Sequence, residues 1–203
     1  MPRAKILDQD RSYTFRSYFE MSHEPEDILA EFGYGFAQET LTLPAGDRPL
    51  PLLPELRQRI ERTLPIVTLT SEMARREALV APILIEIAAF CQCQLRIEYS
   101  LSVNQWLKGN LDYLLRSTQN LLVVEAKHDD LSRGFTQMAV ELIALSEWDE
   151  TQDELYGAVT IGEVWRFGRL ERGSKRIVQD LSLFRVPADL EELVSIVIGI
   201  MER

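Results

Sequence analysis

Four consecutive aliphatic residues, Leu121 to Val124, restrict the fold of this chain more than any other feature; they begin the stretch Leu-Leu-Val-Val-Glu-Ala-Lys. Successive side chains of a strand point to opposite faces, so a strand here is apolar on both faces. Such strands lie inside a sheet that is covered on both sides. The stretch therefore predicts a central strand in a sheet with helices on both faces.

Strand-like and helix-like segments alternate around this run. Apolar periodicity predicts strands over residues 95–103, 106–116, 120–127, 155–162, 164–171 and 176–186. It predicts helices over residues 70–90, 131–148 and 187–203, the first of them kinked or split at Pro82. This order is typical of an α/β (α+β) fold, a central mixed sheet flanked by helices.

The first 60 residues are interpreted as an N-terminal arm or small subdomain, and residues 61–203 as the core domain. Residues 13–21 and 36–43 alternate like strands around a short predicted helix in Glu-Pro-Glu-Asp-Ile-Leu-Ala. Pro44, Pro49, Pro51 and Pro54 then indicate a linker. We expect the arm to pack on the rest of the chain or on a second copy.

Composition narrows the range of partners and locations. The formal net charge of −10 repels nucleic acid at long range unless basic residues cluster. No apolar run reaches the roughly 18 residues of a membrane span, and the N-terminus lacks the apolar core of a secretory signal. Cys91 and Cys93 are too close in sequence for an unstrained disulfide. We therefore expect a cytoplasmic protein with two free thiols and no structural zinc.

Charged residues end the apolar strand. Glu125 and Lys127 share one of its faces, and a hairpin at residues 117–120 would bring Asp112 alongside them. Two partly buried carboxylates do not both stay ionised cheaply, so a proton or a cation must join them. A hard divalent ion such as Mg²⁺ suits this pair. The alternative is a partly buried structural network of Asp112, Glu125 and Lys127, and spacing alone does not decide between the two.

Three motifs in chain order resemble those of a nuclease family. The stretch Gly109 to Asp112 is similar to the Gly-x-x-Asp strand of RecB-type nuclease domains, and Glu125-Ala126-Lys127 to their acid-x-Lys strand. Gln137 begins a segment similar to their Gln-x-x-x-Tyr helix, with Glu141 in place of the tyrosine. Residues 70–165 thus resemble the PD-(D/E)XK nuclease superfamily. Over its whole length the chain is similar to uncharacterised bacterial, particularly cyanobacterial, members, which implies a restriction-endonuclease-like fold.

The resemblance implies a role for each matching residue. Asp112 and Glu125 would be metal ligands, aided by the Ala126 carbonyl. Lys127 would orient the attacking water, and Gln137 would steady the site. Arg133 and Glu141 lie on the same helical face as Gln137, where a solvated helix face is an equally good interpretation.

The resemblance also implies an acid on the helix that starts near residue 70, and both Glu72 and Glu77 fit. We choose Glu77 as the third metal ligand because it shares a helical stripe with Met73, Val80 and Leu84. The helix dipole alone explains an acid in the first turn, where Glu72 lies.

The expected function is hydrolysis of DNA phosphodiester bonds by a nuclease that depends on Mg²⁺ or Mn²⁺ and acts as a possible homodimer. The alternative is a nuclease-like scaffold that has lost catalysis and binds a partner protein, which the net charge favours. The charge around Asp112 discriminates between them, because a nuclease needs basic residues there. The candidates for a basic rim are Arg75, Arg76, Lys108, Arg116 and Arg133.

Overall fold

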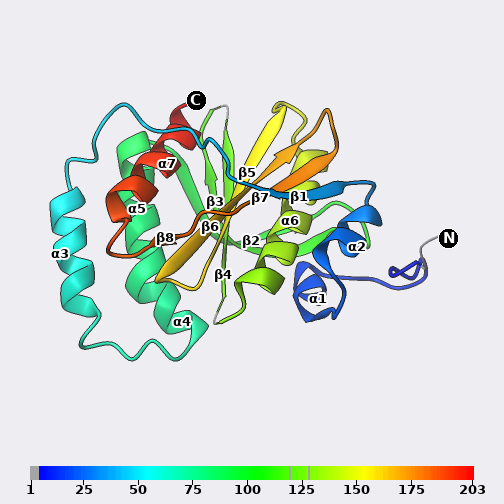
Figure 1. Cartoon of the computed structure of the whole chain (residues 1–203), viewed down its shortest axis with the longest axis horizontal. Helices are drawn as coiled ribbons and strands as arrows, with labels where there is room; N and C mark the ends of the chain where they lie inside the picture. Colours follow the sequence, from blue (N-terminus) through cyan, green and yellow to red (C-terminus); the bar gives the residue numbers. More distant parts are fainter. Residues whose placement is uncertain (1–4, 119, 128) are drawn as a thin grey trace.

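The structure, a computed structural model, describes residues 5–118, 120–127 and 129–203. Within these residues a mixed eight-stranded sheet lies between two layers of helices (Figure 1). This confirms the expected α/β (α+β) class with a central mixed sheet flanked by helices.

The strands and helices follow one another in mixed order. The strands are β1 (Gly35–Glu39), β2 (Gln94–Ser102), β3 (Lys108–Arg116), β4 (Leu121–Ala126), β5 (Glu154–Thr160), β6 (Val164–Glu171), β7 (Arg176–Asp180) and β8 (Phe184–Arg185). The helices are α1 (Phe15–Glu20), α2 (Pro25–Ala30), α3 (Leu53–Thr63), α4 (Glu72–Arg75), the π-helical turn η1 (Arg76–Val80), α5 (Ala81–Cys91), α6 (Leu131–Trp148) and α7 (Leu190–Glu202).

The sheet order is β1-β7-β6-β5-β4-β3-β2, with β8 beside β6. The pairs β4/β5 and β1/β7 are parallel, and the other pairs are antiparallel. Strand β4 therefore lies inside the sheet, and all six of its residues are buried. The antiparallel meander β2-β3-β4 and the four-residue connection between β3 and β4 confirm the sequence prediction for this region.

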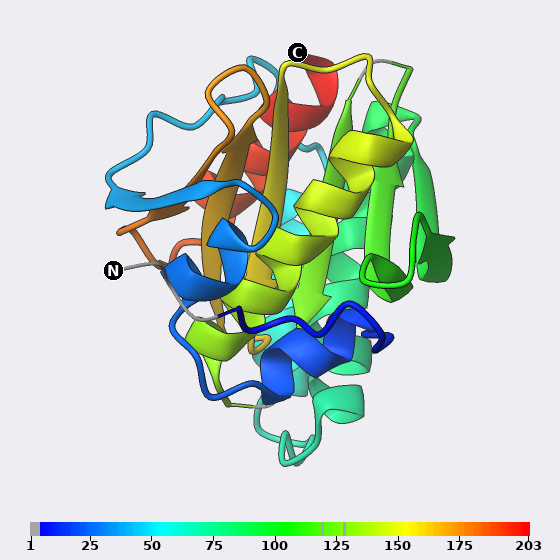
Figure 2. The ribbon, with the colours of Figure 1, turned by 90° about the vertical axis from the view of Figure 1, so that its right-hand side faces the viewer.

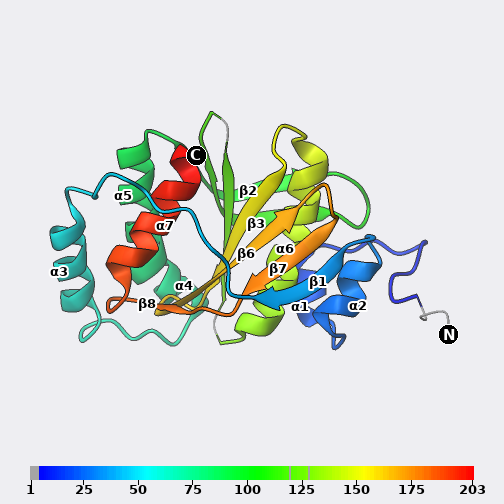
Figure 3. The same cartoon turned by 45° about the horizontal axis from the view of Figure 1, so that its top comes forward.

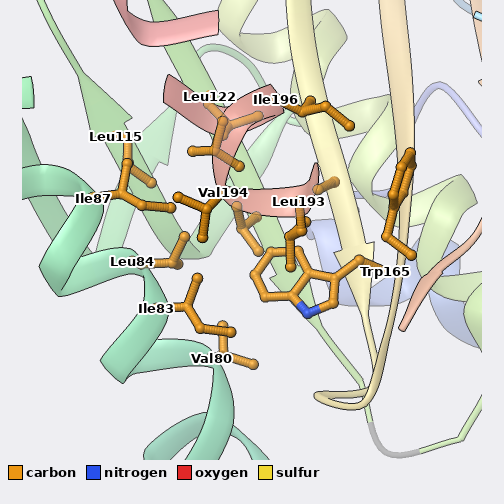
Figure 4. Packing of buried hydrophobic residues seen from close by; sticks show 14 of the residues in the cluster. Val80, Ile83, Leu84, Ile87, Leu115, Leu122, Trp165, Leu193, Val194 and Ile196 are labelled. Carbon is orange, nitrogen blue, oxygen red and sulfur yellow. The ribbon is translucent and has the colours of Figure 1, made fainter. Parts of the chain in front are cut away.

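One face of the sheet is covered by η1, α5 and α7, and α3 packs on the outside of this layer against η1 (Figure 1). Leu115 and Leu122 point to this side, where they meet Ile83 and Leu84 of α5 (Figure 4). The fully buried Trp165 of β6 packs in the same core. Because β4 alternates, its even-numbered residues belong to this core.

The opposite face is covered by α6, which crosses it in Figure 2, and by α1 and α2, which pack against α6. Leu121 and Val123 of β4 pack there against Phe135 and Met138 of α6. Glu125 and Lys127 continue the same alternation, so they leave the strand toward the layer that contains α6 and α1.

Residues 5–60 pack on the rest of the chain, and β1 extends the sheet as the parallel neighbour of β7 (Figure 3). The prediction of a strand over residues 13–21 was wrong. Phe15 and Tyr18 are buried three residues apart, and Thr14 and Ser17 form a capping box, so the segment is helical. Sequence analysis also missed α3, whose Pro54 is compatible with a first helical turn.

The predicted helix over residues 70–90 is present but contains a widened turn. Ser71 caps it by accepting a hydrogen bond from the N–H of Ala74 at 3.1 Å. At η1 the N–H of Ala81 donates to the carbonyl of Arg76, five residues earlier. This widened turn lies directly before Pro82, which has no N–H to donate. The extra residue in η1 rotates the residues of α4 about the helix axis, relative to their positions in a regular helix.

The structure bears on the expectations for the two cysteines and for membrane-spanning helices. Cys91 and Cys93 are free, half-buried thiols, as expected. None of the described helices combines the length and the apolar character that a bilayer span requires.

The contact between residues 44–46 and α7 gives a stability prediction. A Cβ added at Gly199 would lie 2.6 Å from the carbonyl carbon of Ala45. We therefore expect Gly199→Ala to lower the free energy of unfolding by about 1–3 kcal/mol, because backbone must move. Gly173, which has open space around its Cα, is the control, and Gly173→Ala should change stability by less than about 0.5 kcal/mol. Equal urea midpoints for the two variants would contradict this packing.

Candidate active site

The candidate site lies where β3 and β4 separate. Their last backbone pair is Tyr113 with Val124. One step further, Oδ2 of Asp112 accepts a hydrogen bond from the N–H of Ala126 at 2.8 Å. The carboxylate of Asp112 thus replaces a ladder hydrogen bond, and the strands open around it.

Glu125 is the most buried acid at this opening, with 1% of its surface exposed. Its Oε1 lies 2.5 Å from Nζ of Lys127 and accepts a hydrogen bond from Nε2 of Gln137 at 2.5 Å. Its Oε2 is buried and accepts no hydrogen bond from a donor among the described residues, but the carboxylate lies within hydrogen-bonding reach of Glu141, which donates to it when protonated. One oxygen of the carboxylate is thus paired by fixed donors, and the other is paired only when a proton is present.

A cavity of about 550 Å³ connects these groups to the surface. Its lining comes from α1 and the residue before it, from α4 and η1, from strands β2 to β4, and from the residues after β4 as far as α6. The lining residues are Thr14, Arg16, Phe19, Glu72, Arg76, Glu98, Gly109, Asn110, Asp112, Glu125, Lys127, Asp129 and Gln137.

The structure brings four of the five predicted site residues together. Asp112, Glu125, Lys127 and Gln137 all line the cavity. Glu77 is exposed and does not line it, whereas Glu72 does. Regular helical spacing had placed Glu77 toward the sheet, but the widened turn η1 changes which side of the helix faces the site. The helical acid at this cavity is therefore Glu72.

Arg76 was expected only as one of five residues of a basic rim around Asp112, but it lies inside the site. Its Nη1 lies 2.5 Å from Oε1 of Glu98 and 3.2 Å from Oδ1 of Asp112. Its guanidinium also lies over the ring of Tyr113, 5.1 Å from the centroid. Only 8% of the Arg76 side chain is exposed.

The N-terminal segment forms one wall of the cavity, which the sequence pattern did not indicate. Helix α1 places the ring centroid of Phe19 5.0 Å from Nζ of Lys127. On the other side, Gly134 of α6 gives the lysine stem room, because a Cβ at Gly134 would lie 2.9 Å from its Cγ. The ammonium of Lys127 is thus held between an acid and an aromatic ring.

Burial shifts the pKa of each central acid upward. Burial raises the pKa of Glu125 to about 8, and the charge of Asp112 adds to this effect against the opposing effect of Lys127. Burial also raises the pKa of Asp112, although Arg76 and the Ala126 N–H act to lower it. For Lys127, burial alone would lower the pKa, but Glu125 outweighs it and the pKa is raised. Negative charge is therefore in excess here, and the site favours an added proton or cation.

A second buried acid lies behind Glu125. Gln137 Nε2 donates to Glu125 and also to Oε1 of Glu141 at 2.9 Å. Burial and the nearby Glu125 raise the pKa of Glu141 well above its ordinary value, and Glu141 is fully buried. Arg133, by contrast, is exposed and pairs with Asp130, so its interpretation as part of a solvated helix face is confirmed.

The charge of the cavity wall is mostly acidic. Arg76 is the one member of the expected basic rim that lines it. Arg75 instead pairs with Glu163, and Arg116 lies over the ring of Trp148. The acidic lining residues are Glu72, Glu98, Asp112, Glu125 and Asp129, and the basic ones are Arg16, Arg76 and Lys127.

The acids fit a divalent cation with few protein ligands. Across the described residues, no group of three or more His, Cys, Asp or Glu side chains is arranged to hold a metal ion, so the expected three-acid site is not shown. The buried carboxylates of Glu125 and Asp112 nevertheless offer the negative charge that such an ion requires. Mg²⁺ commonly takes one or two protein carboxylates and completes its shell with water and phosphate oxygens.

No protein-family model matches this sequence, and no curated protein matches it significantly. The resemblance to PD-(D/E)XK nucleases therefore depends on the motif residues themselves.

Proposed function

We propose that this chain is a divalent-metal-dependent nuclease that hydrolyses DNA phosphodiester bonds. The observation that carries the proposal is the convergence of Asp112, Glu125 and Lys127 on one cavity. A structural salt-bridge network balances its buried charges, because an unpaired one is costly. Asp112, Glu125 and Glu141 together leave an excess of buried carboxylates here, and this excess favours a site that takes up a proton or a cation.

Each residue of the site would have a separate role in the reaction. The Ala126 N–H holds the Asp112 carboxylate, and Gln137 holds that of Glu125, so both acids are fixed before substrate binds. Lys127 would orient the attacking water and stabilise the negative charge that grows on the phosphorus-bound oxygens. Fixed donors of this kind act without reorganisation during the reaction.

Asp112 and Glu125 would hold Mg²⁺ or Mn²⁺, with the Ala126 carbonyl as a further ligand implied by the resemblance. When bound, the ion supplies Lewis-acid stabilisation of the phosphate and a bound water of lowered pKa.

The proposal is tested by incubating the purified chain with single-stranded and duplex DNA in the presence of Mg²⁺ or Mn²⁺. We expect cleavage that EDTA abolishes. Asp112→Asn, which keeps the size of the side chain, should remove it. Cleavage at the same rate by Asp112→Asn would indicate a contaminating nuclease.

A second candidate is a scaffold that no longer cuts and binds a protein partner. The acidic cavity wall favours it, because DNA phosphates are repelled there unless a cation is bound. A scaffold needs no metal, so its melting temperature should not change with Mg²⁺, whereas the nuclease should be stabilised.

The expected homodimer stays a proposal as well, and light scattering of the purified chain measures its mass directly.

A further inference from the structure

Three local irregularities of the backbone and side chains meet at one contact. Arg76 begins the π-helical turn η1, it is a nearly buried arginine, and its partner Glu98 has a φ of 52° in the middle of β2. A left-handed conformation is unfavourable for glutamate, and such strain persists only where the surroundings hold it. π-Helical turns and left-handed residues other than glycine are both frequent at functional sites.

The regular pairing of β2 with β3 is interrupted at Glu98. Its neighbours on β2 pair regularly with β3, Ile97 with Tyr113 and Tyr99 with Leu111. Between these pairs, Glu98 reaches Nη1 of Arg76 at 2.5 Å. The same nitrogen contacts Oδ1 of Asp112 at 3.2 Å. Glu98 thus holds the arginine beside the proposed metal ligand, inside the cavity.

This contact adds little to stability by itself. Half of the Glu98 side chain is exposed, and ion pairs with one exposed partner are weak. Tyr113 also holds Arg76 without Glu98, because the guanidinium lies over the Tyr113 ring and Nε of Arg76 donates to the Tyr113 hydroxyl at 3.5 Å. The strained glutamate therefore has a clearer role in aiming the guanidinium than in stabilising the fold.

We propose that Arg76 binds the phosphate of the substrate and that Glu98 is a positioning residue that aims Arg76. This inference rests on the proposed nuclease function. A guanidinium presents a planar fork of donors that matches phosphate oxygens, and near a carboxylate-rich wall it supplies the positive charge that the anion needs. Arg76 is suited to this because both acids contact Nη1, one side of the fork.

A matched pair of glycine substitutions tests the role of Glu98. Gln92, at the end of α5, is also exposed and also has a φ of 52°, but it does not line the cavity. Glu98→Gly and Gln92→Gly both relieve a left-handed residue, so both should melt at or above the wild-type temperature. Glu98→Gly should raise the KM for an oligonucleotide at least fivefold and leave the Mg²⁺ concentration for half-maximal rate unchanged. Gln92→Gly should leave both values unchanged.

Two further substitutions keep the test independent of the backbone change. Glu98→Gln retains the side-chain shape without the charge, and Arg76→Lys retains the charge without the planar fork. Both should raise KM as Glu98→Gly does. Wild-type KM in all three variants, with wild-type hydrolysis present, overturns this inference alone. A wild-type protein that hydrolyses no nucleic acid overturns the proposed function and this inference with it.

Discussion

Replacing Lys127 by methionine should lower the rate of DNA hydrolysis by about 10²–10⁴-fold and leave the fold intact. The ammonium lies 2.5 Å from Oε1 of Glu125 and 5.0 Å from the ring centroid of Phe19, at the centre of the cavity. Methionine keeps the apolar stem against Gly134 and removes only the charge. Steady-state hydrolysis of a labelled oligonucleotide measures the loss, and circular dichroism checks the fold.

Lys175 provides the control for this substitution. It is an exposed lysine in the turn between β6 and β7, away from the cavity, and Lys175→Met should keep the wild-type rate. A Lys127→Met protein that still hydrolyses DNA at the wild-type rate would remove Lys127 from the proposed mechanism.

The metal-free protein should become less stable as the pH rises from 6 to 8. Burial raises the pKa of Glu125 from about 4.5 when unfolded to about 8 when folded. The folded state therefore binds this proton more tightly, so its stabilising effect is complete below pH about 4.5 and is lost as the pH rises through 8. One such proton changes the free energy of unfolding by at most about 1.4 kcal/mol per pH unit. The raised pKa of Glu141 acts in the same direction.

Glu125→Gln should reduce this pH slope, because glutamine carries no titrating proton, and should raise stability at pH 8. Added Mg²⁺ should stabilise the wild type more at pH 8 than at pH 6, since protons compete with the cation for the same oxygens. Glu147→Gln, on the exposed end of α6, is the control and should keep the wild-type slope. Urea unfolding at each pH provides the free energies. Stability that rises between pH 6 and 8, or a slope unaltered in Glu125→Gln, would contradict the assignment of the excess charge to Glu125.

The sequence was sufficient for the part of the site that depends on local alternation. The period of two along β4 and the short connection to β3 were enough to place Asp112 beside Glu125 and Lys127. For these three charged residues, one hairpin determines the position of the side chain. Gln137 was expected from the resemblance to the Gln-x-x-x-Tyr helix, and its amide contacts Glu125 in the structure.

Features that depend on tertiary context could not be predicted in the same way. The widened turn η1 leaves no signal in a 3.6-residue pattern, and it reverses the choice between Glu72 and Glu77. The left-handed Glu98 lies in an ordinary strand sequence. Helix α1 appeared as a strand because its six residues are too short for a helical period to emerge, so Phe19 was missed as a wall of the cavity. His128 was expected on the opposite face of the strand from Lys127 and outside the site, and it lies outside the described residues.

Calorimetric titration with Mn²⁺ tests most directly whether Asp112 and Glu125 together bind one divalent cation. We expect one site per wild-type chain at pH 8, no detectable binding in Asp112→Asn, and unchanged binding in the exposed-surface variant Glu147→Gln. Binding of Mn²⁺ to Asp112→Asn with the wild-type affinity, or no binding to the wild type, would contradict a cation site shared by Asp112 and Glu125.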